Sequence, residues 1–223
     1  MVLWDFDGTL ARRDGLFAGA LIDALRRVNE HVTIDRDDVR PHLRAGFPWQ
    51  TPDVISPPLR PHEWWDRLRP VFEHAYSACG VGRDLAAAAA GRVATEFYRP
   101  DAWEPIDGAL DGLRLVKDAG YANVILSNHG PELPALVDGL GLRVDLTITS
   151  AAVGIEKPNP AIFRYALETA NAGPDTWMIG DDPIADIEGA ESVGIRGLLA
   201  DGIYADSRGM TVLEAARIVA ASA

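Results

Sequence analysis

Five short apolar runs, each followed by polar or turn-forming residues, recur along the chain. These runs cover residues 2–4, 122–128, 144–150, 176–182 and 195–201. Apolar runs of this length without alternating polar positions are typical of strands that are buried on both faces, as in a parallel sheet. The last four runs are separated by helix-like segments at residues 131–141, 159–171 and 184–193. Strand alternating with helix predicts a doubly wound, Rossmann-like α/β domain with a parallel sheet.

One long interval, residues 14–99, breaks this alternation. It contains segments with apolar residues at helical spacing and an alanine run at residues 86–90 that favours a helix, and a proline-rich loop at residues 46–61 divides them. We therefore predict that a helical domain is inserted between the first and second strands of the sheet. The predicted domains are an α/β catalytic core formed by residues 1–13 and 100–223 and a helical insertion formed by residues 14–99.

Composition and charge exclude several kinds of partner. The chain of 223 residues is 48% hydrophobic and carries a net charge of −12, which argues against a nucleic-acid surface or an anionic membrane as its main partner. No stretch approaches the roughly 20 apolar residues of a membrane span. Cys79 is the only cysteine, which excludes an internal disulfide and favours a reducing compartment. We therefore expect a soluble cytoplasmic protein, either a monomer or a homodimer.

Polar clusters follow three of the predicted strands. They are "DFDGT" at residues 5–9, Ser127 with Asn128, and "GDDPIAD" at residues 180–186. In open α/β sheets ligands bind at the carboxyl ends of the strands, where these clusters lie. Asp5 and Asp7 stand only two residues apart, and like charges at that spacing repel each other. This pair therefore indicates that a cation binds there, and the five histidines show no paired spacing that would make zinc the metal.

The three clusters, together with Lys157 in "GIEKPNP", resemble in order and type the four motifs of the haloacid dehalogenase superfamily of hydrolases. The resemblance covers residues 1–13 and 100–201. The helical insertion matches that family's insertion-type cap in position and helical character. The resemblance implies a Mg²⁺-dependent hydrolase that acts on a small phosphorylated metabolite.

The resemblance also implies roles for the carboxylates. A carboxylate can attack phosphorus directly and form an aspartyl-phosphate, and Asp5 is placed to do so. Mg²⁺ prefers a few carboxylates with waters and substrate oxygens, so Asp5 and Asp181 are the expected side-chain ligands. The family pattern adds the backbone carbonyl of Asp7 to the metal ligands. The Asp7 side chain then acts as general acid to the leaving alkoxide and as base to the attacking water.

Five further residues complete the expected site. Ser127 and the amide of Asn128 are expected to donate hydrogen bonds to phosphoryl oxygens, and Lys157 to pair with both nucleophile and phosphate. Asp182 and Asp186 are expected to orient metal-bound water or Lys157, and direct ligation by Asp186 stays open. Asp182 is equally well suited to cap the helix that starts at Pro183.

Substrate choice is expected to lie in the helical insertion, because the core motifs handle only the phosphoryl group. Arg44 is the main candidate for a substrate contact. The aromatic residues nearby either contact substrate or pack the insertion: Phe47, Trp49, Trp64 and Trp65. His129 is either a rim residue of the site or a surface loop residue, and Thr9 favours a local turn bond.

The preferred function is a phosphatase of a small phosphomonoester. A dehalogenase of the same superfamily attacks carbon and needs neither metal nor the second aspartate, so Asp7 and the acidic "GDDPIAD" disfavour it. A phosphomutase uses the same aspartyl-phosphate, but family mutases usually carry an acidic residue where this chain has Gly180. A non-catalytic phospho-binding module is the alternative of a different class, and it would show no turnover.

Overall fold

A five-stranded parallel sheet forms the centre of the computed structural model, which describes residues 1–173, 175–202 and 209–223. The strand order is β5-β4-β1-β6-β7, and every neighbouring pair is parallel. The strands are β1 (Val2–Trp4), β4 (Asn123–Ser127), β5 (Leu146–Thr149), β6 (Trp177–Gly180) and β7 (Arg196–Leu199). Each lies inside one of the predicted apolar runs, so the predicted α/β sheet is confirmed.

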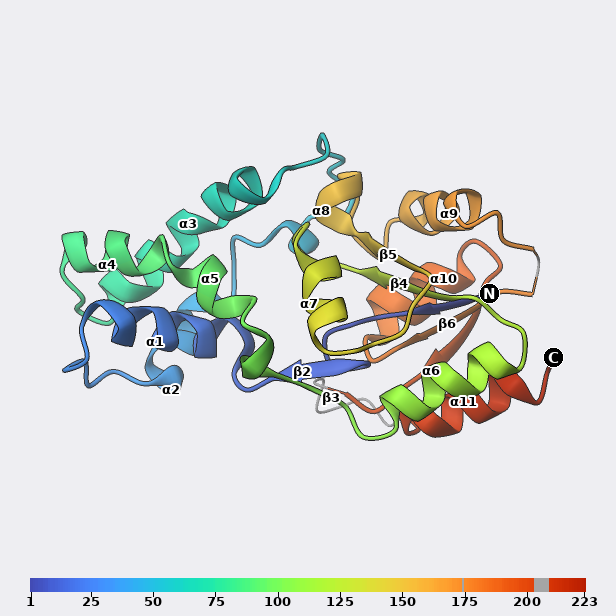
Figure 1. The fold of residues 1–223 in the computed structure, drawn as a ribbon. Helices are drawn as coiled ribbons and strands as arrows, with labels where there is room; N and C mark the ends of the chain where they lie inside the picture. Colours follow the sequence, from blue (N-terminus) through green and yellow to red (C-terminus); the bar gives the residue numbers. More distant parts are fainter. Residues whose placement is uncertain (174, 203–208) are drawn as a thin grey trace.

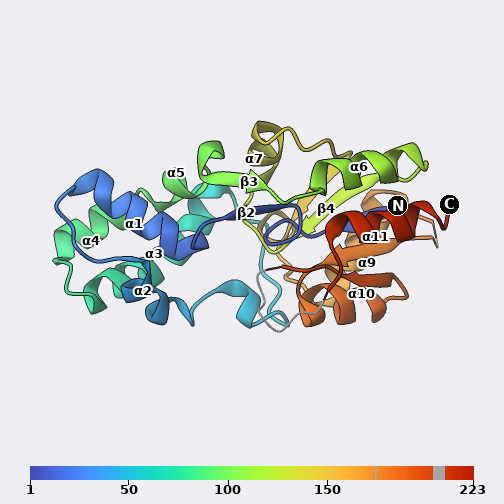
Figure 2. The same cartoon turned by 90° about the horizontal axis from the view of Figure 1, so that it is seen from below.

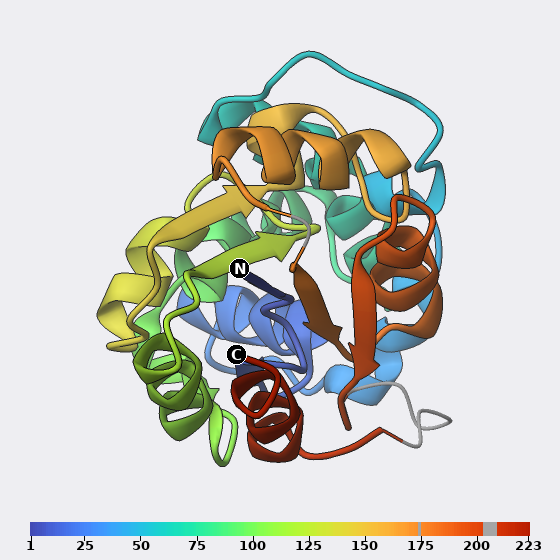
Figure 3. The same cartoon turned by 90° about the vertical axis from the view of Figure 1, so that its right-hand side faces the viewer.

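The sheet is buried on both faces, which explains why its strands read as continuous apolar runs. Val2 and Trp4 pack into one hydrophobic cluster, and Leu3 packs into a second cluster on the opposite face. The first cluster includes α6 (Ala109–Asp118) and α11 (Val212–Ala220), and the second includes α9 (Pro160–Thr169). Figure 3 shows α6 (green) and α11 (dark red) on one side of the strands and α9 (orange) on the other.

Short helices follow the other strands of the core. They are α7 (Leu133–Gly139) after β4, α8 (Ser150–Val153) after β5, and η4 (Pro183–Glu188) with α10 (Gly189–Glu191) after β6. The segment predicted as one helix at residues 184–193 is thus a π-helical turn that continues into a short α-helix. The helices α6 and α11 were not predicted from the sequence, although both complete the first hydrophobic cluster.

Residues 14–102 form a separate helical layer beside the sheet (Figures 1 and 2). Its helices are α1 (Leu16–Val28), α2 (Arg36–Val39), η1 (Arg40–Leu43), η2 (Pro48–Gln50), α3 (Pro61–Ala78), α4 (Arg83–Ala90), α5 (Val93–Phe97) and η3 (Pro100–Ala102). The chain enters and leaves this layer through an antiparallel pair, β2 (Ala11–Arg13) and β3 (Trp103–Pro105), in which Arg12 lies opposite Glu104. This small pair was not predicted.

The loop between η2 and α3 connects the helical layer to the core a second time. The Ser56 N–H donates to the Gly154 carbonyl at 2.8 Å, and the Leu59 N–H donates to the Ala151 carbonyl at 2.8 Å. Gly154 has a φ of 81°, and a Cβ at this position would lie 1.8 Å from the Ser56 oxygen. The close approach therefore requires glycine at residue 154. Within the described part of the chain, no helix combines the length and apolarity needed to cross a membrane.

Candidate active site

The carboxyl ends of three adjacent strands bring polar side chains to one cavity. Asp5 follows β1, Ser127 ends β4 and Asp181 follows β6, and all three line a cavity of about 520 Å³ between the sheet edge and the helical layer. The Asp5 N–H donates to the Ile179 carbonyl at 2.9 Å, which fixes the end of β1 against β6. The location agrees with the rule that α/β sheets bind ligands at this edge, and the volume suits a small-molecule site.

Lys157 is a buried cation at the floor of this cavity. Its side chain is 2% exposed, and its Nζ lies 2.8 Å from Asp5 Oδ1 and 2.5 Å from Asp186 Oδ1. Burial disfavours the charged form of Lys157, but the carboxylates of Asp186 and Asp5 outweigh this effect and raise its pKa. Removing Lys157 would leave the carboxylates of Asp5 and Asp186 in the interior without the cation that they share.

Asn128 holds the backbone of Lys157 from both sides. The Asn128 Nδ2 donates to the Lys157 carbonyl at 2.9 Å, and the Lys157 N–H donates to Asn128 Oδ1 at 2.7 Å. The predicted substrate contact of Asn128 can therefore come only from its backbone amide, since the side chain is committed to Lys157. The side chain of Ser127 lines the cavity beside it.

Three buried carboxylates could share a metal ion. One ligand oxygen from each of Asp5, Asp181 and Asp186 lies within 4.8 Å of the others. The Thr9 hydroxyl donates to Asp181 Oδ1 at 3.2 Å, so its hydrogen bond goes to this acidic group rather than to a local turn. An all-oxygen donor set suits a hard cation such as Mg²⁺ better than a soft one. The donor set includes Asp186, whose direct ligation the sequence left open.

Asp7 differs from Asp5 in its surroundings. Burial raises the pKa of Asp7 well above its usual value, and the neighbouring carboxylates of Asp5 and Asp181 raise it further. Its Oδ1 is buried without a hydrogen-bond partner among the described residues, and His129 Nε2 lies 3.8 Å from it. A carboxyl group in this environment favours the protonated form, as a general acid requires.

His129 is buried, which decides between the two positions expected from sequence. Its ring lines the cavity, it is 4% exposed, and Nδ1 lies 2.7 Å from the Tyr98 hydroxyl. Burial lowers the pKa of His129 to about 4, so the ring is neutral at pH 7. Tyr98 follows the last residue of α5. The contact between Tyr98 and His129 therefore joins the helical layer to the core beside Asp7.

Asp182 and Asp186 have different structural roles. Asp182 Oδ1 accepts from the N–H groups of Ile184 and Ala185 at 2.8 and 2.9 Å, so it caps the helical turn η4. Asp186 is fully buried and accepts from Lys157 and, at 3.0 Å, from the Asp182 N–H. Burial raises the pKa of Asp186, against the opposing pull of Lys157. Asp182 thus stabilises the loop, and Asp186 orients the lysine.

The helical layer supplies an aromatic side to the cavity. Its lining residues, called here the aromatic wall, are Phe17, Trp49, Trp65, Phe97 and Tyr98. Trp49 and Trp65 were candidates from sequence, whereas Phe17, Phe97 and Tyr98 were not. Whether these three side chains face the cavity depends on how the helical layer packs. The helical spacing of Phe17 indicated that it lies on a packed face, but not that this face borders the cavity. Trp64 is 2% exposed and also borders the cavity.

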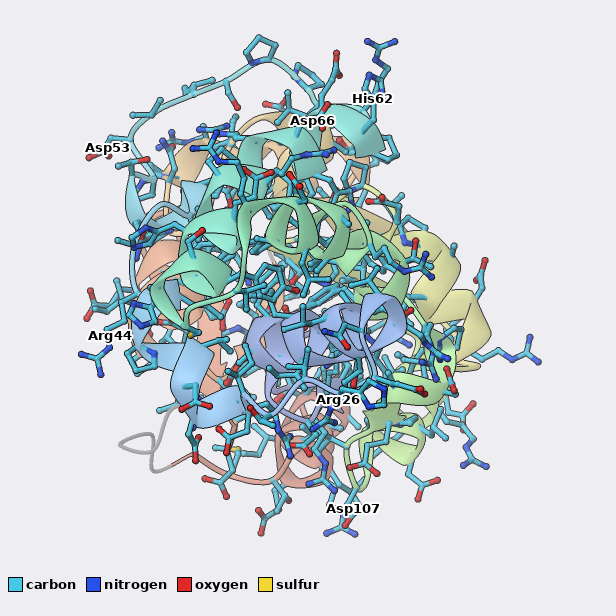
Figure 4. The ribbon with its side chains drawn as sticks, turned by 90° about the vertical axis from the view of Figure 1, so that its left-hand side faces the viewer. Arg26, Arg44, Asp53, His62, Asp66 and Asp107 are labelled. Atoms are coloured by element: carbon cyan, nitrogen blue, oxygen red, sulfur yellow. The ribbon has the colours of Figure 1, made fainter. Side chains whose placement is uncertain are left out.

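The structure does not bring Arg44 to the cavity. Its side chain is exposed, and Figure 4 shows it extending outward from the surface. It is absent from the described residues that line the cavity. Phe47 is buried and stacks on Trp49 with a centroid distance of 4.5 Å, so it supports the aromatic wall from behind.

Clustered carboxyl groups and a buried lysine lie at the carboxyl edge of a doubly wound sheet, beneath a helical insertion. This arrangement defines the class of α/β proteins with an acidic ligand-binding site at the strand ends. The chain belongs to the haloacid dehalogenase-like hydrolases, whose family model matches residues 1–194. The resemblance seen in the sequence is thereby confirmed.

Individual relatives carry different activities. The chain is 32% identical over 151 residues to the human haloacid dehalogenase-like hydrolase domain-containing protein 3, a match that covers 66% of this chain and 59% of that protein. It is 33% identical over 139 residues to the phosphoserine phosphatase of Thermus thermophilus, with 60% and 53% covered. Among solved structures, the 2-haloacid dehalogenase of Pseudomonas syringae pv. tomato matches with a TM-score of 0.63 at 21% identity, over 100% of this chain and 98% of that one.

The chain spans little more than half the length of the two curated relatives, 59% and 53%. The structural similarity, at 21% identity, concerns the fold alone. Neither comparison fixes the substrate, so the chemistry has to be argued from the side chains of the site.

Proposed function

We propose that this protein is a Mg²⁺-dependent phosphatase of a small phosphomonoester that works through an aspartyl-phosphate. One observation carries the proposal. Asp5, paired with Lys157, and Asp7, without a cationic partner among the described residues, face the same cavity. Two carboxyl groups with such different surroundings suit a nucleophile and a proton shuttle.

The first half of the reaction transfers the phosphoryl group to the protein. A carboxylate oxygen of Asp5 attacks phosphorus, and the bond between phosphorus and the ester oxygen breaks. Asp7 gives its proton to the departing alkoxide, which leaves as the alcohol. Lys157 balances the charge that spreads over Asp5 and the phosphoryl oxygens.

The second half restores the protein. A water molecule gives a proton to the Asp7 carboxylate and attacks phosphorus, and the bond to Asp5 breaks. Inorganic phosphate leaves, Asp5 is again a carboxylate and Asp7 is again protonated. Ser127 and the backbone amide of Asn128 donate hydrogen bonds to the phosphoryl oxygens, and the Asn128 side chain keeps Lys157 in place.

Mg²⁺ would be held by Asp5, Asp181 and the backbone carbonyl of Asp7, with Asp186 as a further oxygen ligand within reach. When bound, it neutralises the repulsion between phosphate and the carboxylates and polarises the phosphoryl oxygens. Residues 14–99 act as a cap that covers the cavity and selects the substrate, and residues 1–13 with 100–223 act as the catalytic core.

The geometry also ranks the related activities. A Cβ on Gly180 would lie 2.2 Å from Asp186 Oδ2, so no acidic side chain fits where family mutases usually carry one. A haloacid would bring a carboxylate, and the described lining of the cavity holds no arginine and, beside Lys157, no other lysine to pair with it. Both observations favour the phosphatase.

Phosphate release from a panel of phosphorylated metabolites, with Mg²⁺ or EDTA, tests the proposal. We expect release that requires Mg²⁺ and falls by about four orders of magnitude or more in Asp5→Asn, because the nucleophile is lost. Asp118→Asn is the matched control, since Asp118 is exposed at the end of α6 and should leave the rate unchanged. Release that persists in Asp5→Asn, or chloride release from 2-chloropropionate instead, would refute the phosphatase mechanism.

A further inference from the structure

The cavity has two chemically unlike sides, and only one of them is explained by phosphate chemistry. The floor carries the carboxylates and Lys157, whereas the opposite side is the aromatic wall. The rings of the wall pack against one another. Phe17 stacks on Phe97 at 4.6 Å with an interplanar angle of 14°, and Phe17 lies 6.0 Å from Trp49 at 22°. Trp65 meets Phe97 edge-on at 5.9 Å.

The side chains of the aromatic wall do not bury one another completely. Phe17, Trp49, Trp65 and Tyr98 all remain only partly buried, although each lies among aromatic neighbours. Large apolar side chains left open toward a cavity gain free energy when an apolar ligand displaces water from them. Roughly 150 Å³ is enough to hold benzene, so a cavity of about 520 Å³ has room for a phosphoryl group and a ring.

The charges of the lining restrict what that ring can carry. Lys157 is the sole lysine among the described lining residues, and Asp5 and Asp186 already bind its Nζ. His129 is neutral at pH 7, and the carboxyl groups of Asp7, Asp181 and Asp182 supply no positive charge. A second anionic group on the substrate would lose its hydration and meet no counter-charge near the wall.

We propose that the organic part of the substrate is an uncharged, planar aromatic group that packs against Phe17, Trp49 and Trp65. This inference rests on the proposed phosphatase function, whose phosphoryl site fixes where the organic part must lie. Aromatic rings gain from stacked and edge-on contacts beyond the burial of their area, so a flat ring is preferred over an aliphatic ring of similar size. Phosphate esters that carry a carboxylate on the organic part are poor substrates.

Equilibrium binding of non-hydrolysable phosphonates tests this inference without relying on turnover. Isothermal titration calorimetry with Mg²⁺ compares benzylphosphonate with its ethyl, cyclohexylmethyl and 4-carboxybenzyl counterparts. We expect benzylphosphonate to bind at least about tenfold more tightly than the ethyl compound. The preference over cyclohexylmethyl is expected to be about fivefold, the factor given by an aromatic contact of about 1 kcal/mol. The 4-carboxybenzyl compound is expected to bind about tenfold more weakly than benzylphosphonate.

Substitutions in the aromatic wall test whether the wall causes the preference for an aromatic ligand. Trp49→Leu and Trp65→Leu should each narrow the ratio between benzyl and cyclohexylmethyl binding, while Trp49→Phe, which keeps a ring, should retain it. Tyr165→Leu is the control, because Tyr165 is an exposed aromatic residue on α9, outside the cavity. Circular dichroism confirms that each variant is folded. A preference that survives both leucine substitutions would overturn the assignment to the wall.

The two proposals fail in different ways. Ethyl or 4-carboxybenzyl phosphonate binding as tightly as the benzyl compound would overturn the aromatic substrate, whether or not the protein releases phosphate. Tight benzyl binding without phosphate release from benzyl phosphate would instead refute the phosphatase and leave the aromatic site standing.

Discussion

The side chain of Asn128 offers the sharpest test of how the site is held together. Asn128→Ala removes the donor to the Lys157 carbonyl at 2.9 Å and the acceptor of the Lys157 N–H at 2.7 Å. The lysine keeps its two carboxylate partners, but its backbone loses both side-chain anchors. We therefore expect Lys157 Nζ to move relative to Asp5 and the phosphoryl group.

The magnitude follows from the two lost hydrogen bonds. A typical intramolecular hydrogen bond contributes about 1 kcal/mol net, so the free energy of unfolding should fall by about 2 kcal/mol. Misplacement of a catalytic group by about 1 Å costs on the order of 100-fold in rate. We therefore expect kcat/KM for phosphate release to fall about 100-fold, an effect larger than the loss of stability alone explains.

Asn123→Ala is the matched control. Asn123 is the first residue of β4, the strand that Asn128 follows. It is 1% exposed and, like Asn128, makes two side-chain hydrogen bonds. Its Oδ1 accepts from Trp4 Nε1 at 2.9 Å and its Nδ2 donates to the Leu113 carbonyl at 2.8 Å. Urea unfolding should show a similar destabilisation of both variants, whereas only Asn128→Ala should lose activity. Equal rates in the two variants would refute the idea that Asn128 positions Lys157.

Three further predictions concern His129, Asp182 and Arg44. Burial lowers the pKa of His129 from 6.5 to about 4, so between these pH values the unfolded chain binds a proton that the folded protein does not. Stability from this group is complete above pH 6.5 and falls by about 3 kcal/mol as the pH drops to 4. Asp7 and Tyr98 face residue 129 in the wild type and in His129→Gln alike. In urea unfolding, His129→Gln should therefore lack the fall in stability between pH 6.5 and 4 that is due to His129. His31→Gln, which changes an exposed histidine, should show the same fall as the wild type. Asp182→Ala should lower the free energy of unfolding by about 1 kcal/mol in thermal melts, and Asp182→Ser, which can still cap η4, should not; equal losses would refute the capping role. Arg44→Ala should leave KM unchanged, because the side chain lies outside the cavity, and a several-fold rise would place it at the substrate.

The gathering of polar residues at the carboxyl edge of the sheet could be predicted because it depends on strand ends. Short apolar runs locate the strands, and parallel strands in one sheet place Asp5, Ser127 and Asp181 together whatever the rest of the chain does. The helices α6 and α11, which were not predicted, also have apolar residues at helical spacing. Leu113 and Val116 repeat at helical spacing, and Val212 and Val219 do the same.

The aromatic wall, and which of Asp182 and Asp186 reaches Lys157, could not be predicted in the same way. A helix face indicates that Phe17 is packed, but the packing of the helical layer decides whether it faces the cavity. Arg44 illustrates the reverse case, because a charged residue in a loop near the aromatic residues points away from them. Likewise, Asp182 and Asp186 are four residues apart, and only the turn of η4 sends the latter to Lys157.

The pair of aspartates that opens the chain depends on this tertiary detail for its chemistry. The same loop after β1 carries both residues, so their sequence context alone would give them similar properties. Lys157 arrives from beyond β5 and binds Asp5 at 2.8 Å, while Asp7 Oδ1 faces His129 at 3.8 Å and burial raises its pKa. A cation on one carboxylate and a neutral ring beside the other separate the two groups in charge and proton affinity. Because Asn128 holds Lys157 and Tyr98 holds His129, the division of labour proposed for Asp5 and Asp7 also depends on these two residues.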